Sequence, residues 1–415
     1  MSTTTKGQVC VVIGASHAGV NFAFNLRREG WEGEIIVYDI DKEFPYHRPP
    51  LSKAYLTSEE GTEHSLLFPK ENYQTDNVSL KLGIAVNNIN RENKSVTLSD
   101  GLVQSYDKLV IATGARPFMP PINGIDTANN LFPMRTAEDS VNIRKAFNAS
   151  EKKRVVVIGG GYIGLETAAS LKKLGAQVVV LEREERVLAR VTAPVMSEFF
   201  TELHQSNNVE ISTNKNVVSI ETNDGVNTIV CDDNSKYEAD VIVVGVGIRV
   251  NTELAEKAGL TIENGIKVNE TAKTNDDDIY AVGDCTYHYN PHYKTNLRLE
   301  SVQNAVDQAK TAAKAICGQE DIIYDSIPWF WSDQFNVKLQ MVGLSNGYNQ
   351  IVTRKEDTKN SFSTWYFKDD ELLAVDAVNF PKAYMLGTKF IKSGQKLDKA
   401  KLEDISIPFK PNNFI

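Results

Sequence analysis

The chain contains one local pattern twice: an apolar run that ends at a glycine-rich turn and continues into helix-forming sequence. Val9–Ile13 precedes Gly14 in the first copy, and Val155–Ile158 precedes Gly159 in the second, 145 residues further on. Unbroken apolar runs of this length are typical of parallel strands that are buried on both faces. A strand, a glycine turn and a helix in that order begin a dinucleotide-binding unit. The repeat therefore predicts an α/β fold with two doubly wound dinucleotide-binding domains.

Each copy continues into a second strand with an acidic residue at its end. These strands are predicted over Glu34–Asp39 and Gln177–Glu182. Three more apolar segments stop at glycine turns, and α/β proteins bind ligands at sheet edges of this kind. Proline-rich sequence between Pro117 and Pro121 indicates a crossover between domains. The three further predicted strands cover Lys108–Ala112, Asp240–Val244 and Ile279–Val282.

The sequence changes character after Ile323. Short, aromatic segments bounded by turns follow there, which is typical of antiparallel strands. At least one of Trp329 and Trp331 is expected to lie in the core of this part. The end of the chain is therefore predicted to be a separate α+β domain. Its strands are predicted over residues 327–331, 338–342 and 361–367, and its helices over 383–393 and 398–402.

The second glycine turn carries the complete dinucleotide fingerprint. Gly159 permits a tight turn, Gly161 lets a pyrophosphate approach the backbone, and Gly164 allows close helix packing. The helix that follows supplies unpaired N–H groups for phosphate at its first turn. Glu182 lies 21 residues beyond Gly161, at the position expected of an acid that binds a ribose.

A glutamate at position 182 predicts a preference for NADH over NADPH. Its carboxylate can accept a hydrogen bond from the 2′-hydroxyl of the ribose, whereas a 2′-phosphate would face a like charge. Arg183 and Arg186 follow closely and are expected to soften this preference.

The first glycine turn departs from the fingerprint at one position. Its outer glycines stand as expected, but Ser16 adds a side chain where a bare backbone is usual. Asp39, 20 residues beyond Gly19, is the predicted ribose-binding acid, and Asp41 is the alternative. Asp39 ranks above Asp41 because it ends the apolar run. His17 is expected to begin the helix near a phosphate rather than to act as a base.

Composition and charge exclude several classes of protein. Apolar residues make up 41% and charged residues 24%, as in ordinary globular proteins. The net charge of −9 argues against a nucleic-acid-binding protein, and no apolar run approaches the roughly 18 residues of a membrane span. The polar segment Met1–Gly7 lacks the apolar stretch of a signal peptide, so the expected compartment is the cytoplasm.

The sequence shows no motif of a metal enzyme or a serine hydrolase. The four cysteines are too far apart for a metal knuckle or a redox pair, and the six histidines form no H-E-x-x-H motif. A G-x-S-x-G turn is also missing. We therefore predict no metal site, and the scattered thiols fit a reducing compartment. The cysteines are Cys10, Cys231, Cys285 and Cys317.

The combination of motifs resembles the two-dinucleotide flavoprotein disulfide reductases. Besides the two glycine turns it includes Ala112-Thr113-Gly114 and Gly283-Asp284, and the resemblance spans about residues 9–315. In that superfamily the first unit binds FAD and the second binds NAD(P)H, so the resemblance implies both cofactors here. Asp284 would contact the ribityl chain of the flavin, and it is also suited to cap a helix.

Disulfide reductases carry an active cysteine soon after the first unit, but the segment Phe44–Lys53 contains none. That segment resembles the ferredoxin reductases of oxygenase systems, of the putidaredoxin reductase and biphenyl-dioxygenase reductase type. Arg135-Thr136, Glu300–Ala305 and Pro328–Gln334 are similar to the same family, so the resemblance covers nearly the whole chain. It implies an FAD-binding domain over 1–115 and 245–322, a NAD-binding domain over 116–244 and a C-terminal reductase domain over 323–415.

The resemblance also implies which residues serve the cofactors. Lys53 and Glu166 would form a catalytic pair near the flavin, where a cation stabilises the anionic reduced ring. An aromatic residue of the C-terminal domain, taken as Trp329, would lie beside the flavin and face the partner protein. The implied cofactor-binding residues are Gly14, Ala15, Ser16, His17, Ala18, Gly19, Asp39, Arg48, Lys53, Val86, Ala112, Thr113, Gly114, Arg135, Gly159, Gly161, Tyr162, Ile163, Gly164, Glu166, Glu182, Gly247, Asp284, Val302 and Trp329.

We therefore expect an FAD-dependent NADH:ferredoxin oxidoreductase. Hydride transfer from NADH would reduce FAD, and single electrons would pass to a [2Fe–2S] ferredoxin that serves a cytochrome P450 or a Rieske dioxygenase. The alternatives are a rubredoxin reductase and, ranked lower, an apoptosis-inducing-factor-like flavoprotein. The chain is expected to be a monomer or homodimer that binds no nucleic acid. Since such ferredoxins are acidic, docking would need a local basic patch, for which Lys310, Lys314 and Lys338 are candidates.

Overall fold

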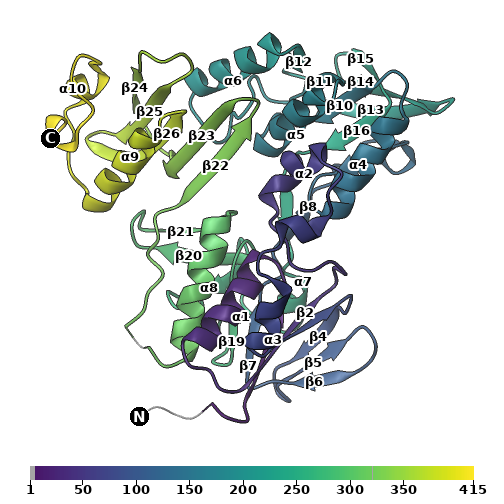
Figure 1. The fold of residues 1–415 in the computed structure, drawn as a ribbon, viewed down its shortest axis with the longest axis vertical. Coiled ribbons are helices and arrows are strands. Elements are labelled where there is room, and N and C mark those ends of the chain that lie inside the picture. The colour runs from purple at the N-terminus through teal and green to yellow at the C-terminus, as the bar shows by residue number, and fades with distance from the viewer. Residues whose placement is uncertain (1–4, 320) are drawn as a thin grey trace. The chain divides into compact units, whose positions relative to one another are not determined.

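The structure, a computed structural model, describes residues 5–319 and 321–415, which form two compact units (Figure 1). The first four residues of the polar segment Met1–Gly7 lie outside the described residues. Across residues 5–319 and 321–415, no helix is long and apolar enough to cross a membrane. The first unit comprises Met1–His47, Glu60–Arg116 and Arg249–Pro328, and the second comprises Arg48–Glu59, Pro117–Ile248 and Trp329–Ile415.

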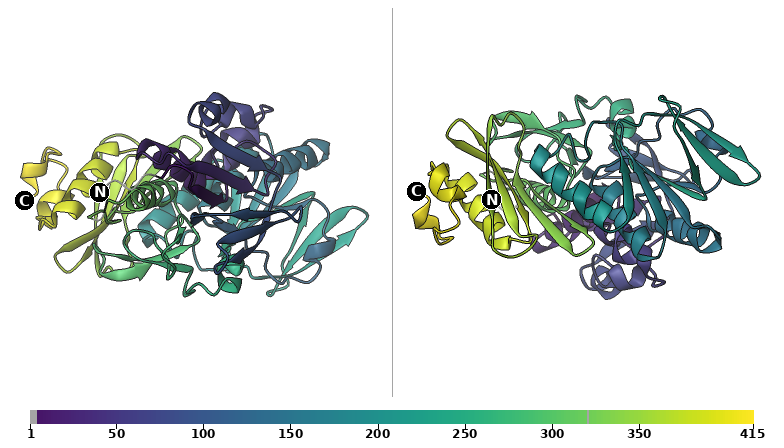
Figure 2. Two further views of the ribbon diagram at one scale, coloured as in Figure 1. Left: turned by 90° about the horizontal axis from the view of Figure 1, so that it is seen from below. Right: turned by 90° about the horizontal axis from the view of Figure 1, so that it is seen from above.

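A five-stranded parallel sheet in the order β19-β7-β1-β2-β3 forms the centre of the first unit. Helices α1 (His17–Arg28) and α8 (Val302–Ile316) lie side by side over one face (Figures 1 and 2). Small side chains such as Ala309 and Ala312 on α8 share a buried core with Phe22 of α1. The strands are β1 (Val9–Ile13), β2 (Glu34–Asp39), β3 (Val78–Leu82), β7 (Lys108–Ile111) and β19 (Ile279–Ala281).

Two smaller sheets, one antiparallel and one mixed, cover the other face of this sheet. Ile89 and Val96 of one of them share a buried core with Leu109 and Ile111 of β7. Two short sheets contribute, β4 (Val86–Asn90) with β5 (Ser95–Leu98) and β6 (Val103–Ser105), and β18 (Ile266–Val268) with β20 (Thr286–Asn290) and β21 (Thr295–Leu297). The helices of this unit besides α1 and α8 are α3 (Lys70–Thr75) and α7 (Glu253–Lys257).

The second unit contains another parallel sheet, in the order β12-β11-β10-β16-β9. Val156, Ile158 and Ile242 on one of its faces are buried against the antiparallel sheet β13-β14-β15. Its strands are β9 (Leu131–Pro133), β10 (Arg154–Ile158), β11 (Gln177–Leu181), β12 (Val209–Ser212) and β16 (Val241–Val244). The covering elements are β13 (Val217–Asn223), β14 (Val226–Cys231), β15 (Lys236–Ala239), α2 (Ala54–Thr57), α4 (Ala137–Ala149), α5 (Tyr162–Lys173) and α6 (Pro194–Ser206).

An antiparallel sheet in the order β22-β23-β26-β25-β24 also belongs to the second unit. Helix α9 (Pro381–Ser393) packs closely on it at Gly387, where a Cβ would lie 2.6 Å from the side chain of Val375. The strands are β22 (Trp329–Gln334), β23 (Val337–Gly343), β24 (Gln350–Lys355), β25 (Phe362–Lys368) and β26 (Glu371–Val378), and the helix α10 (Lys399–Glu403) follows α9.

Arg354 ties the end of the chain to this sheet. The side chain of Arg354 is only 2% exposed, and its guanidinium stacks near the rings of Phe409 and Phe414. Every donor nitrogen of a buried guanidinium needs an acceptor. The acceptors of Arg354 are the side chain of Glu356 and the backbone carbonyls of Leu402, Asp404, Ile405 and Ile407.

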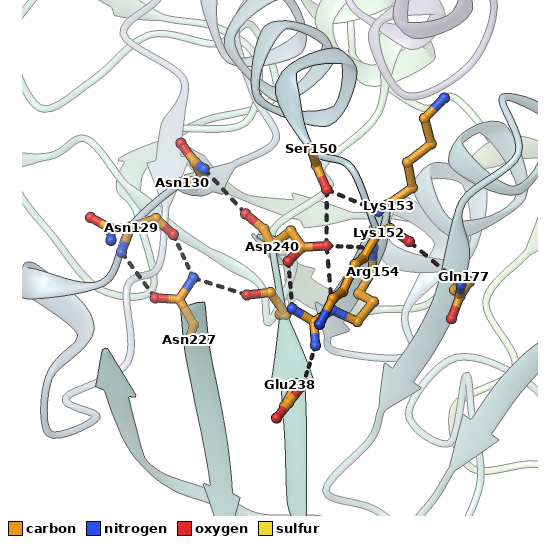
Figure 3. Close-up of polar contacts among 11 residues, drawn as sticks. Asn129, Asn130, Ser150, Lys152, Lys153, Arg154, Gln177, Asn227, Glu238 and Asp240 are labelled. Atoms are coloured by element: carbon orange, nitrogen blue, oxygen red, sulfur yellow. Dashed lines mark hydrogen bonds and ion pairs between the residues drawn. The ribbon is translucent and has the colours of Figure 1, made fainter. Parts of the chain in front are cut away.

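A polar cluster fixes the start of β10, at the sheet edge opposite the glycine turn (Figure 3). Asp240 accepts hydrogen bonds from the hydroxyl of Ser150 and from the backbone and guanidinium of Arg154, at 2.6–3.3 Å. Burial opposes the ionisation of Asp240, but the hydrogen bonds from Arg154 and Ser150 outweigh it and lower the pKa of the carboxyl group. Arg154 also pairs with Glu238 of β15, so this cluster ties the start of β10 to the antiparallel sheet.

The fold class and both parallel sheets are as predicted, whereas several strands were not foreseen. The predicted strand Glu34–Asp39 agrees with β2 residue for residue. The strands that were missed are β3, β9 and β12 of the parallel sheets, β24 and β26 of the C-terminal sheet, and the strands of the small sheets. The expectation of a core tryptophan at Trp329 or Trp331 is wrong, since neither side chain is buried. Both lie on the edge strand β22, where a side chain has a neighbouring strand on one side only. The three-domain division is a proposal, which the two separate sheets of the second unit support.

Candidate active site

The carboxyl ends of the parallel strands bring the predicted residues of the first unit together. The register pairs Ile13 of β1 with Ile111 of β7 and with Tyr38 of β2, and Ile111 with Ala281 of β19. The residues that follow these strands therefore lie at one edge of the sheet, where the strand order reverses around β1. They are the glycine turn from Gly14, Asp39, Ala112-Thr113-Gly114 and Gly283-Asp284.

The first glycine turn requires its two glycines for steric reasons. Gly14 has a φ of +108°, and a Cβ there would lie 2.3 Å from the carbonyl oxygen of Ala112. A Cβ on Gly19 would lie 1.9 Å from the carbonyl oxygen of Gly14. Either contact is far inside van der Waals distance, so only glycine permits this approach of helix and strand. Ser16, in contrast, has a φ of −96°, which any residue adopts, so its departure from the fingerprint costs nothing in the backbone.

The start of α1 fits an anionic group. Its first turn has no acidic residue, and the side chain of Ser16 makes no capping hydrogen bond to the helix. The backbone N–H groups there point out of the helix and carry its positive dipole end. His17 is the first residue of α1 and is buried, with its ring 5.6 Å from that of His47.

Asp39 reaches the glycine turn, and Asp41 does not. The carboxylate of Asp39 accepts from the backbone N–H of Ala15 and, at 2.8 Å, from that of Asp41. The carboxylate of Asp41 instead accepts from the hydroxyl of Tyr46 and the N–H of Glu43. The hydrogen bond from the N–H of Ala15 holds Asp39 beside the turn, which is where a ribose ligand has to lie.

The second glycine turn has the same construction. Gly159 has a φ of +110°, and Cβ atoms on Gly159 and Gly164 would lie 2.5 Å and 2.0 Å from backbone oxygens. A Cβ on Gly161 would meet nothing within 4 Å, so the backbone there is open to a ligand. Glu182 accepts from the N–H of Gly160 at 2.6 Å, just as Asp39 accepts from Ala15. Both turns thus pair an open helix start with an acid held at the turn.

Of the two arginines near Glu182, one is already engaged. Arg186 donates to the carbonyl oxygens of Ala189 and Thr192 and to the hydroxyl of Ser197. These acceptors are neutral and hold the guanidinium in place with its positive charge, so the expectation that Arg186 softens the cofactor preference stays a prediction. Arg183 is exposed and pairs with Glu184 at 2.9 Å.

Lys53 and Glu166, although far apart in sequence, form an ion pair in the second unit. The Nζ of Lys53 lies 2.7 Å from Oε2 of Glu166 and also donates to the carbonyl of Pro49, at 3.0 Å. Glu166 is only 1% exposed, so its carboxylate depends on protein donors. The structure therefore brings together the two residues that were expected to form a pair.

Two serines that the sequence did not single out complete the surroundings of Glu166. Ser52 donates to Oε2 at 2.6 Å, and Ser332 on β22 donates to Oε1 at 2.7 Å. Both serines are buried. The alternation of side chains along β22 was the available signal, because it places Ser332 on the face opposite Trp329 and Trp331.

The other predicted residues lie at several places in the structure. Arg48 donates to the carbonyl of Arg135 at 2.8 Å, so the structure brings these two together. Tyr162 begins α5, and its hydroxyl lies 2.8 Å from the sulfur of Met341. Gly247 has a φ of +117° with open space around it. Val86 begins β4, Val302 begins α8 next to the capping Ser301, Ile163 is 42% exposed and Trp329 is 37% exposed.

Known proteins match nearly the whole length of this chain. Residues 8–309 match the family model of pyridine nucleotide-disulphide oxidoreductases, and residues 329–412 match that of the reductase C-terminal domain. Putidaredoxin reductase of Pseudomonas putida is 41% identical over 96% of this chain and 95% of its own length. Rubredoxin-NAD(+) reductase of the same species is 36% identical, over 90% and 96% respectively. The solved covalent putidaredoxin reductase–putidaredoxin complex matches with a TM-score of 0.92 and 40% identity, over 97% of each chain.

Proposed function

Since this chain belongs to the pyridine nucleotide-disulphide oxidoreductase family, we propose that it carries electrons from NADH through FAD to a [2Fe–2S] ferredoxin. The ferredoxin would serve a cytochrome P450 or a Rieske dioxygenase. The observation that carries the proposal is the pair of similarly built glycine turns, each with an acid held at the turn, in one chain that also contains a reductase C-terminal domain. The expected compartment is the cytoplasm.

The residues divide between the two cofactors. Asp39 and the N–H groups at the start of α1 would hold the ribose and pyrophosphate of FAD. Glu182 and the start of α5 would do the same for NADH. Bound FAD supplies a two-electron acceptor for hydride that can release its electrons singly. Lys53 supplies a positive charge that Glu166 holds in place.

The positions of the cysteines favour a reductase that needs no thiol relay. Cys10, Cys231 and Cys285 are buried, and burial raises the pKa of each thiol. A buried neutral thiol is a poor nucleophile. No cysteine occurs in Phe44–Lys53, the segment that leads to the ion pair.

Flavin content and acceptor range test the proposed function directly. The purified protein should be yellow, carry one non-covalent FAD per chain and reduce a [2Fe–2S] ferredoxin with NADH. The acceptors to compare are [2Fe–2S] ferredoxins and rubredoxins at equal concentration, with ferricyanide as a control for flavin reduction. Faster turnover with rubredoxin would select the alternative reductase, and a folded protein that cannot take up FAD would contradict both.

We expect a clear preference for NADH over NADPH. A phosphate charge about 4 Å from the Glu182 carboxylate would cost about 4 kcal/mol at an effective dielectric of 20, less what solvent screens. The kcat/KM for NADPH should therefore be lower by about tenfold or more, and Glu182→Gln should narrow the gap. Glu184→Gln, which changes the neighbouring acid, is the matched control. Equal kcat/KM values for the two cofactors would contradict the role of Glu182.

Docking of the ferredoxin is expected to depend on Lys310. This lysine is exposed on α8, one helical turn before Lys314 on the same face. Lys310→Glu should weaken ferredoxin reduction most at low ionic strength, where screening is least, and leave ferricyanide reduction unchanged. Lys257→Glu reverses an exposed charge on α7 of the same unit and serves as the control. Wild-type ferredoxin turnover by Lys310→Glu at low salt would place the docking face elsewhere.

A further inference from the structure

A buried chain of hydrogen bonds runs from helix α6 to the carboxylate of Glu166. His204 Nε2 lies 2.9 Å from Oε1 of Gln334, and Nε2 of Gln334 lies 3.2 Å from Oγ of Ser332. Ser332 Oγ in turn lies 2.7 Å from Oε1 of Glu166. All four side chains are at most 1% exposed. His204, Gln334 and Ser332 belong neither to the glycine turns nor to the segment that contains Lys53.

Chemistry fixes the direction of donation along this chain. Glu166 pairs with the ammonium of Lys53, and a carboxylate only accepts, so the hydroxyl of Ser332 donates to it. Ser332 then accepts from the amide N–H of Gln334, and this leaves Oε1 of Gln334 to accept from His204. Burial lowers the pKa of His204 to about 4, so its ring is neutral with one proton, which Nε2 carries. Each donor along this series of hydrogen bonds therefore points towards Glu166.

The two oxygens of Glu166 are held by different parts of the second unit. Oε2 accepts from Ser52 and Lys53, which flank the end of the 3₁₀ turn Pro49–Ser52. Oε1 accepts from Ser332, on the first strand of the C-terminal sheet. Without the Ser332 hydroxyl, Oε1 would keep no protein donor among the described residues. The carboxylate would then be held through Oε2 alone, so its orientation, and with it the position of Lys53, would be less tightly fixed.

We propose that Ser332, oriented by Gln334 and His204, is a positioning residue for the Lys53–Glu166 pair, and through it for reduction of the flavin by NADH. This inference rests on the proposed function. It gives the C-terminal domain a part in the reductive half-reaction, since β22 supplies a hydrogen bond to the carboxylate on α5.

Single-turnover reduction of the flavin by NADH tests the proposal in the FAD-loaded protein, without a ferredoxin. Ser332→Ala should slow this step roughly tenfold with little change in NADH affinity. Ser363→Ala is the matched control, because Ser363 is a fully buried serine of the same sheet. Its hydroxyl accepts a hydrogen bond from the indole N–H of Trp365. In a Glu166→Gln background the Ser332→Ala effect should disappear, which a general loss of stability would not produce. Ser332→Thr, which keeps the hydroxyl, should restore most of the rate.

A second readout does not depend on activity. NMR of histidine-labelled protein should show His204 as the neutral Nε2–H tautomer between pH 6 and 8, in wild type and in the Ser363→Ala control. A proton on Nδ1, or a Ser332→Ala rate equal to wild type, would overturn the proposal. A wild-type flavin that NADH fails to reduce would instead contradict the proposed function, so the two failures are distinguishable. Gln334→Leu should reproduce the slower rate if Ser332→Ala does not fold.

Discussion

Glu166→Gln is expected to slow the reduction of bound flavin by NADH roughly 100-fold, with FAD content unchanged. The substitution keeps the volume of the buried side chain but removes the charge that holds Lys53 at 2.7 Å. One of its two polar groups would also become a donor and face other donors, Ser52 with Lys53 on one side or Ser332 on the other. Stopped-flow absorbance of the flavin measures the rate directly.

Lys53→Met should slow the reduction of the flavin about as much as Glu166→Gln does. The variant that carries both substitutions should be little slower than either single variant. Two residues that act as one unit give effects that do not add. Glu202→Gln on α6, which neutralises an exposed glutamate of the same unit, is the matched control. Rates equal to wild type for both single variants would remove the pair from the catalytic residues. Loss of FAD in either variant would show a role in binding instead.

Asp376→Asn is expected to change how stability depends on pH. Asp376 is buried on β26 and accepts from the hydroxyls of Tyr366 and Thr192, at 2.5 Å and 2.7 Å. Burial outweighs these hydrogen bonds and raises the pKa of Asp376 to about 6. A carboxyl whose pKa is higher in the folded than in the unfolded chain costs stability as the pH rises between the two values.

The unfolded value for an aspartate is about 3.9, so the cost builds up between about pH 4 and pH 6. A pKa raised by two units lowers the free energy of unfolding by about 3 kcal/mol, and this loss is complete above pH 7. Asparagine does not titrate, so the stability of Asp376→Asn relative to wild type should improve by up to that amount from pH 4 to pH 7.5. Denaturant midpoints at both pH values measure it, with the exposed Asp357→Asn as control. A constant difference between Asp376→Asn and wild type across this range would refute a buried ionised Asp376.

The glycine turns were predictable from sequence because their geometry is local. The positive φ of Gly14 and Gly159 and the close contact of strand with helix demand glycine within a few residues of an apolar run. The acid at the end of the next strand is fixed by the same unit, so Asp39 and Glu182 could be named with it. The central strands of the two parallel sheets followed from these runs, whereas the outer strands β3, β9 and β12 did not.

The partners of Glu166 could not be predicted in this way. Ser332 lies 166 residues further along the chain and Ser52 lies 114 residues before it, so no spacing in the sequence relates them. Alternation along β22 shows only that Ser332 and Trp329 occupy opposite faces, not which helix each face meets. The same holds for Arg354, whose acceptors are backbone carbonyls about 50 residues away, because any residue type supplies a carbonyl.

The pairing of β19 with β7 sets an order of events during synthesis. The five strands of the second parallel sheet lie between Leu131 and Val244, and all of them leave the ribosome before Ile279. That sheet can form its hydrogen bonds while the first still lacks β19 and the helix α8 that covers it. Until then the apolar edge of β7 is unpaired, and unpaired edges of this kind recruit other chains. The nascent chain is therefore most exposed to aggregation, and most in need of a chaperone, between the completion of the second sheet and the arrival of residues 279–316.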